Sequence, residues 1–171
     1  MDKYQTQTPE SQSQMTATQA LTQLKEGNER FVKRMGFDRD LQQQVKLTST
    51  GQYPYVAIVS WIDSRIPTEL VFDQGIGDVF NARIAGNFVN EDILGSLEFA
   101  CKLAGSKLIV VMGHTSCGAV KGACDDAKLG NLTQMLDKIK PAVDSTETRP
   151  GEDRSSANLQ FVDRVAKQMS G

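Results

Sequence analysis

Residues 107–120, Lys-Leu-Ile-Val-Val-Met followed by Gly-His-Thr-Ser-Cys-Gly-Ala-Val, decide the fold. The apolar, β-branched run at 107–112 predicts a buried parallel strand. Gly113 and the small residues after it predict a tight turn, and a helical pattern begins near Ala119. His114, the only histidine of the chain, therefore lies at the carboxyl end of a strand, where open α/β sheets bind their ligands.

Two helical patterns before residue 50 predict an N-terminal helical arm, and strand and helix patterns alternate from residue 55 onward. Alternation of this kind implies parallel strands joined by right-handed crossovers, so the predicted class is α/β, a parallel sheet flanked by helices. The expected strands are 55–60, 79–84 and 107–112. The expected helices are about 16–35, 38–47, 67–73 with Pro67 at its first position, 91–104, 119–128, 132–143 and 156–170.

The composition is that of an ordinary globular protein. The 171 residues carry a formal net charge of -2, which argues against a nucleic-acid partner. No apolar run approaches the roughly 20 residues of a membrane helix, so no membrane partner is expected. Three cysteines, an odd number, without a secretory leader argue against a disulfide framework and favour a cytoplasmic location.

The polar start of the chain differs from the rest. Residues 1–15 are rich in Gln, Thr and Ser, which predicts a disordered N-terminal arm. Residues 16–171 have the length and apolar content of one domain.

Two strand ends carry chemically capable residues. After the strand at 55–60, Asp63 and Arg65 flank Ser64, and a guanidinium that binds a carboxylate keeps it ionised and oriented. The alternative is that Asp63 and Arg65 form an exposed ion pair, which would contribute little to stability. His114 and Cys117 can aim two metal-ligating atoms at one point, but zinc needs three or four ligands. A turn histidine and a small buried thiol are the alternative.

Two other chemistries would start from the same turn. A phosphate-binding P-loop is excluded because Ala119 and Val120 stand where Lys and Ser or Thr are required. A thiol phosphatase or sulfurtransferase would use Cys117 as a nucleophile of low pKa. Such an enzyme also needs an arginine to close its anion loop, and no Arg lies between Cys117 and Asn131.

Together the two strand ends resemble the β-class carbonic anhydrases. The family signature is Cys-x-Asp-Ser-Arg followed by His-x-x-Cys, and this chain has Asp63-Ser64-Arg65 and His114-Thr115-Ser116-Cys117. The resemblance covers roughly residues 20–145. It includes the segments 25–31, 73–75, 83–87 and 96–100.

The resemblance implies a zinc enzyme that reversibly hydrates carbon dioxide to bicarbonate. In that family two cysteines and one histidine hold zinc, which makes His114 and Cys117 ligands, and a zinc-bound hydroxide attacks carbon dioxide. Asp63, oriented by Arg65, would accept a hydrogen bond from that hydroxide, so these two residues are the implied catalytic pair. The implied substrate-binding residues are Gln52, Phe80, Phe99 and Gly118.

Three of these substrate-binding positions also have a purely structural explanation. Gln52 is equally explained as a solvated loop residue, and Phe80 and Phe99 as core residues of a strand and a helix. The family's aromatic wall packs across a dimer interface, so the resemblance also implies a homodimer or higher homo-oligomer. Family members usually continue into a further helix and an edge strand, which leads us to expect a sheet without that C-terminal edge strand.

Position 61 departs from the signature. The first zinc-binding cysteine of the family falls on Trp61, whose indole cannot ligate zinc. Asp63 is the candidate replacement ligand beside His114 and Cys117, whereas Cys101 and Cys124 lie in apolar helical patterns. Two functions are therefore expected: a carbonic anhydrase whose activity Trp61 impairs, or a catalytically inactive, zinc-poor homologue that acts as an oligomeric scaffold.

Overall fold

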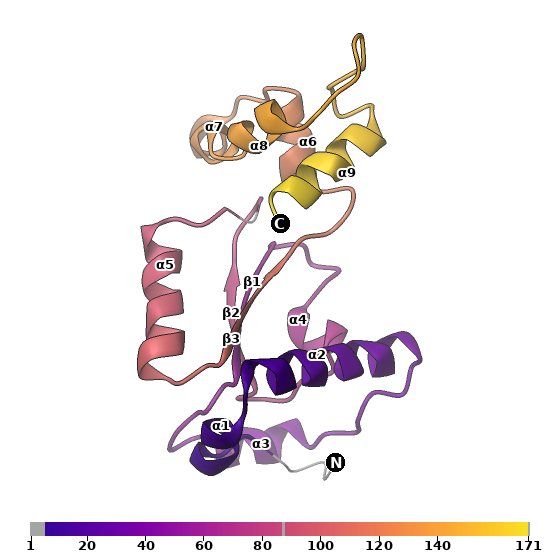
Figure 1. Ribbon diagram of the computed structural model, residues 1–171. Helices are drawn as coiled ribbons and strands as arrows, with labels where there is room; N and C mark the ends of the chain where they lie inside the picture. The colour runs from indigo at the N-terminus through magenta and orange to yellow at the C-terminus, as the bar shows by residue number, and fades with distance from the viewer. Residues whose placement is uncertain (1–5, 87, 171) are drawn as a thin grey trace. The chain divides into compact units, whose positions relative to one another are not determined.

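The computed structural model describes residues 6–86 and 88–170 (Figure 1). The chain divides into two compact units. The described residues of unit 1 fall within Met1–Val59, Ser64–Ala82 and Asn90–Val110, and those of unit 2 within Ser60–Asp63, Arg83–Val89 and Val111–Gly171. The single domain expected over residues 16–171 stays a prediction.

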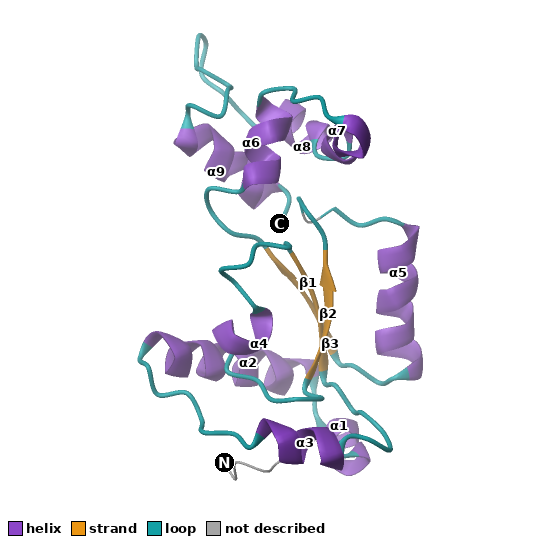
Figure 2. Cartoon of the chain, turned by 180° about the vertical axis from the view of Figure 1, so that it is seen from behind, coloured by secondary structure: helices purple, strands orange, loops and turns teal. Residues whose placement is uncertain are grey.

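A three-stranded parallel sheet carries the fold, with the strand order β2-β1-β3 (Figure 2). β1 spans Val56–Ser60, β2 spans Val79–Arg83 and β3 spans Leu108–Met112. All five residues of the central strand β1 are buried, as is usual for a parallel strand covered on both faces. Within unit 1, helix α5 (Glu91–Glu98) lies on one face of the sheet, and helices α2 (Ala17–Val32) and α4 (Thr68–Val71) lie on the other (Figures 1 and 2). These elements confirm the predicted α/β class and all three predicted strands.

The prediction that β3 is a buried strand is wrong. The side chains of Ile109 and Val111 remain 44% and 41% exposed. β3 lies at an edge of the sheet and alternates between half-buried and exposed residues. A continuous apolar run predicts cover on both faces, but it cannot specify whether an element is available to cover the second face.

The polar amino-terminal stretch contains a helix, α1 (Pro9–Gln14), where a disordered arm was expected. The Thr8 hydroxyl and the Ser11 side chain form a reciprocal capping box that starts it. The Gln12 side-chain amide donates to the carbonyl oxygens of Pro54 at 2.7 Å and Ala104 at 2.8 Å. These specific polar contacts order residues 9–14 in a composition typical of disorder, whereas residues 1–5 of the expected arm lie outside the described residues.

The remaining helices of unit 1 follow the predicted pattern closely. Gly27 lets helix α2 pack closely against the backbone at Phe72, because a Cβ at Gly27 would lie 1.9 Å from the Phe72 carbonyl oxygen. Pro67 is the N-cap of its short helix rather than the first residue. The helix expected at 91–104 ends in a π-helical segment. The helices are α2 (Ala17–Val32), α3 (Leu41–Leu47), α4 (Thr68–Val71), α5 (Glu91–Glu98) and the π-helix η1 (Phe99–Leu103).

Unit 2 is built from helices around an apolar core. The helix expected at 132–143 is in fact two helices, because Pro141 lacks an N–H donor and fits only the first turn of a new helix. The helices are α6 (Gly118–Cys124), α7 (Gly130–Asp137), α8 (Lys140–Ser145) and α9 (Leu159–Gln168). No helix among the described residues combines the length and apolar character needed to cross a membrane.

Candidate active site at the strand ends

The two motif segments meet in unit 2. Asp63 follows β1, and His114 and Cys117 lie in the turn between β3 and α6. A small pocket of about 200 Å³ brings them together. Its lining residues are Trp61, Ile62, Asp63, Ala85, Gly86, His114, Cys117, Gly118 and Ala119.

Trp61 is a core residue of this unit. It is 1% exposed and heads the fully buried side chains by volume. Its ring lies edge-on to the His114 imidazole, with 4.2 Å between ring centroids and 70° between the planes. The indole Nε1 has no hydrogen-bond partner among the described residues, which carries a cost of about 1–3 kcal/mol for a buried donor. The indole is therefore held by apolar packing rather than by a hydrogen bond.

His114 has one nitrogen occupied by the backbone. Its Nδ1 lies 2.7 Å from the Thr115 carbonyl oxygen, so we assign the proton of the imidazole to Nδ1. Its Nε2 lies 3.4 Å from Asp63 Oδ2, and the two side chains are only 13% and 16% exposed. Nε2 therefore faces a carboxylate, and the imidazole ring as a whole borders the indole.

Cys117 occupies the N-cap position of α6 and is 4% exposed. The turn before it is fixed by Ser116, which adopts a φ of 57° and donates its N–H to Asp163 Oδ1 at 3.2 Å. None of the three cysteines forms a disulfide. Cys101 and Cys124 do not line the pocket, and burial raises the pKa of the Cys124 thiol. Neither is placed as a substitute ligand.

Arg83 is the residue whose role the sequence did not reveal. Its guanidinium donates from Nε to the Trp61 carbonyl oxygen at 3.0 Å and from Nη2 to the Asp63 carbonyl oxygen at 2.6 Å. These bonds fix the backbone of residues 61–63, which carries the side chains of Trp61 and Asp63. The only signal in the sequence was its place in a segment shared with the resembling family.

Of the other predicted residues, Gly118 lines the pocket in unit 2, whereas Gln52, Arg65, Phe80 and Phe99 lie in unit 1. Arg65 and Gln52 are exposed, and the roles expected for them stay predictions. The Phe80 and Phe99 rings are 6.2 Å apart at 73° and line a cavity of about 610 Å³. Phe99 is 51% exposed, so the alternative that it is a core residue of a helix is wrong. Its role in the wall of the substrate pocket stays a prediction.

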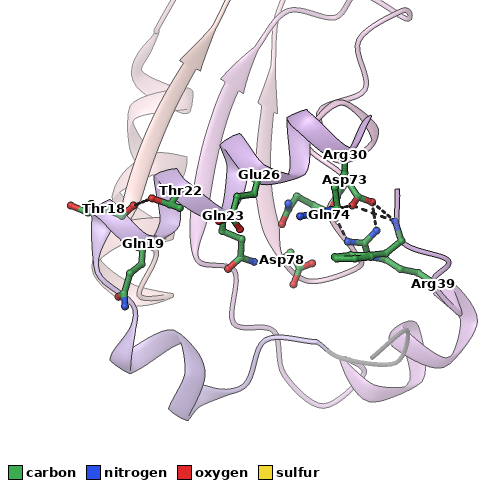
Figure 3. A pocket seen from close by; sticks show the side chains of 11 residues that line it. Thr18, Gln19, Thr22, Gln23, Glu26, Arg30, Arg39, Asp73, Gln74 and Asp78 are labelled. Carbon is green, nitrogen blue, oxygen red and sulfur yellow. Dashed lines mark hydrogen bonds and ion pairs between the residues drawn. The ribbon is translucent and has the colours of Figure 1, made fainter. Parts of the chain in front are cut away.

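Unit 1 also contains a polar cleft of about 380 Å³ along α2 (Figure 3). Arg30 Nε donates to Asp73 Oδ2 at 2.5 Å, and Arg39 Nη1 donates to Asp73 Oδ1. The Phe37 N–H also reaches this carboxylate. The guanidinium groups in this cleft are thus partnered by a carboxylate of the same unit, and the arrangement stabilises the fold locally.

The residues present do not fit the zinc site that the resemblance implies. Zinc sites need three or four ligands. Within residues 6–86 and 88–170, no three His, Cys, Asp or Glu side chains are placed to hold a metal ion. The set Asp63, His114 and Cys117 is consequently not assembled as a ligand group, and the buried indole of Trp61 borders His114.

Comparison of the sequence with known proteins gives a consistent result. The model of the carbonic anhydrase family matches residues 56–170. Carbonic anhydrase 2 of Mycobacterium tuberculosis is 41% identical over 128 residues, which cover 70% of this chain and 61% of the relative. Carbonic anhydrase of Mycolicibacterium smegmatis is 36% identical over 127 residues, with the same coverage of 70% and 61%. The chain thus spans about three-fifths of the length of these relatives.

Solved structures share the fold. The β-carbonic anhydrase CcaA superposes with a TM-score of 0.63 at 24% identity, covering 87% of this chain and 69% of that one. A tetrameric β-carbonic anhydrase from Sordaria macrospora gives a TM-score of 0.61 at 25% identity, covering 72% and 64%. Because the family model matches the whole sheet and all of α6–α9, the chain belongs to the β-class carbonic anhydrases.

Proposed function

We propose that this protein carries the framework for reversible hydration of carbon dioxide to bicarbonate, and that Trp61 impairs the reaction. One observation carries the proposal. The indole of Trp61 is 1% exposed and lies 4.2 Å from the His114 ring, at the position where the family has a zinc-binding cysteine. Family membership supports the reaction, and the buried indole supports the impairment.

The surroundings of the pocket suit the proposed substrate. Ala85, Gly86 and Ala119 give an apolar wall, which fits an uncharged molecule such as carbon dioxide. Asp63 supplies a hydrogen-bond acceptor beside His114. Arg83 fixes the backbone on either side of Ile62, so the pocket wall is preorganised.

An inactive, zinc-poor homologue that acts as an oligomeric scaffold is the second candidate. It is favoured by the lack of a three-residue ligand group among the described residues. A homodimer or higher homo-oligomer belongs to both candidates, and the tetrameric relative from Sordaria macrospora supports it. The absence of disulfides among the three cysteines is consistent with the proposed cytoplasmic location.

The test compares the unaltered chain with Trp61→Cys. We expect the variant to purify with about one zinc per chain, the stoichiometry of a mononuclear site, and to hydrate carbon dioxide in a stopped-flow assay. We expect the unaltered chain to hold far less zinc and to hydrate carbon dioxide much more slowly. The matched control is Trp61→Cys combined with Cys117→Ala, which restores one thiolate and removes the other.

Two outcomes would contradict parts of the proposal. Stoichiometric zinc and comparable hydration in the unaltered chain would show that Trp61 impairs nothing. Zinc binding by Trp61→Cys without hydration would remove the enzymatic proposal and leave the scaffold. Circular dichroism spectra of all variants check that each is folded.

A further inference from the structure

The indole of Trp61 connects the same segments of unit 2 that a metal would connect in the family. It is carried by the segment after β1, borders His114 after β3, and shares an apolar cluster with Cys117 at the start of α6. A Cβ added at Gly113 would lie 3.5 Å from the indole Cζ2, so the turn after β3 also packs closely against the ring. These are the chain segments that contain the family's three zinc-ligand positions.

The indole also reaches the helical core of the unit. Trp61 is one member of a single cluster of buried residues contributed by α6, α7, α8 and α9. Burial of so large an apolar side chain strongly stabilises the unit, and the unsatisfied Nε1 offsets only part of that stabilisation. The remaining buried members are Cys117, Val120, Ala123, Leu136, Ile139, Val143, Phe161, Val162, Val165 and Ala166.

Both loops that flank the ring are fixed by protein groups. Arg83 binds the carbonyl oxygens of Trp61 and Asp63, and the Ile84 N–H donates to the Ser60 carbonyl oxygen at 3.0 Å. On the other side, Ser116 is held by Asp163. Hydrogen bonds within the protein therefore order these loops without a bound ion.

We infer that Trp61 replaces the metal as the structural cross-link of unit 2, so that this unit folds and remains stable independently of zinc. The inference rests on the proposed function only for the assignment of position 61. Metal sites that hold protein segments together contribute their binding free energy to folding. In this chain the apolar contacts of one side chain supply that stabilisation.

The test is urea unfolding of the full chain in chelator and in excess zinc. Trp61 is the only tryptophan, so its fluorescence reports on unit 2 specifically, and circular dichroism follows variants that lack it. We expect the midpoint of the unaltered chain to be the same under both conditions. Trp61→Cys should unfold at lower urea in chelator and regain roughly 1 M in midpoint with zinc at about a hundred times its dissociation constant.

Two further variants isolate the role of the ring. Trp61→Phe keeps an aromatic filler without the orphaned N–H, and we expect it to remain insensitive to zinc. Trp61→Cys with Cys117→Ala should lose the zinc response. A zinc-dependent midpoint in the unaltered chain would overturn the inference, as would an unchanged midpoint of Trp61→Cys in chelator. Failure of hydration in a zinc-stabilised Trp61→Cys would instead count against the proposed function alone.

Discussion

Asp73 in unit 1 and Trp61 in unit 2 are both nearly inaccessible, yet opposite interactions hold them. Asp73 is 7% exposed, and its carboxylate accepts hydrogen bonds from Arg30, Arg39 and the Phe37 N–H. Trp61 is 1% exposed, and its Nε1 has no partner among the described residues. Unit 1 thus buries a carboxylate that is paired with two guanidinium groups. Unit 2 buries a large apolar ring whose N–H donor has no partner among the described residues. The first site should be sensitive to a change of charge and the second to a change of size.

Trp61→Ala should have the largest effect on stability. It removes the indole from the core of unit 2 and leaves a cavity that the packed helices cannot fill, so we expect a loss of about 4 kcal/mol in the free energy of unfolding. Urea unfolding followed by circular dichroism measures it. Ile62→Ala is the matched control, because Ile62 is 61% exposed and its truncation should change little. Equal effects of the two substitutions would show that Trp61 is not a core residue.

Asp73→Asn should come second. It keeps the size of the side chain and removes the charge, which leaves two guanidinium groups, on side chains 22% and 12% exposed, without their carboxylate. We expect a loss of about 3 kcal/mol, at the lower end of the range for breaking a buried ion pair. Asp38→Asn, at an exposed carboxylate nearby in the sequence, serves as the control. If both variants unfold like the unaltered chain, the cluster around Asp73 contributes nothing to stability.

The pH dependence of the same variant separates charge from shape. Burial alone would raise the pKa of Asp73, but hydrogen bonds from Arg30 and Arg39 outweigh it and hold the pKa below its ordinary value. Because the folded pKa is lower than the unfolded one, this stabilisation is present above the unfolded pKa and is lost as the pH falls through the folded pKa. Asp73→Asn should therefore flatten the acid side of the stability curve, whereas Trp61→Ala should shift the whole curve down.

The contrast also explains what the sequence could and could not predict about the fold. The three strands and most helices were predictable because hydrophobic periodicity is local. The exposure of Ile109 in β3 depends on which elements cover the sheet, which no local pattern records. Helix α1 depends on Gln12 finding two carbonyl groups distant in the sequence, and such partners exist only once the chain has folded.

The candidate site divides in the same way. The approach of Asp63 to His114 was predictable because the carboxyl ends of parallel strands meet at one edge. The resemblance also predicted that Trp61 stands at a ligand position, but not that its ring is buried against His114. The clamp by Arg83 acts through backbone carbonyl oxygens, and an interaction with the backbone leaves no signature in the side chains it positions.

The smallest effect on stability should come from an ion pair in unit 2, between Glu152 and Arg164, whose side chains are 18% and 39% exposed. Hydrogen bonds from Arg164, the Arg149 N–H and Asn158 hold the pKa of Glu152 at about 2. Arg164→Met should raise that pKa toward the ordinary range of a glutamate, as measured by carbon-detected NMR titration, yet shift the urea midpoint far less than Asp73→Asn. Solvent screens the pair at the surface, so a shifted pKa there need not bring stability. A midpoint loss as large as that of Asp73→Asn would mean that unit 2, too, depends on matched charge.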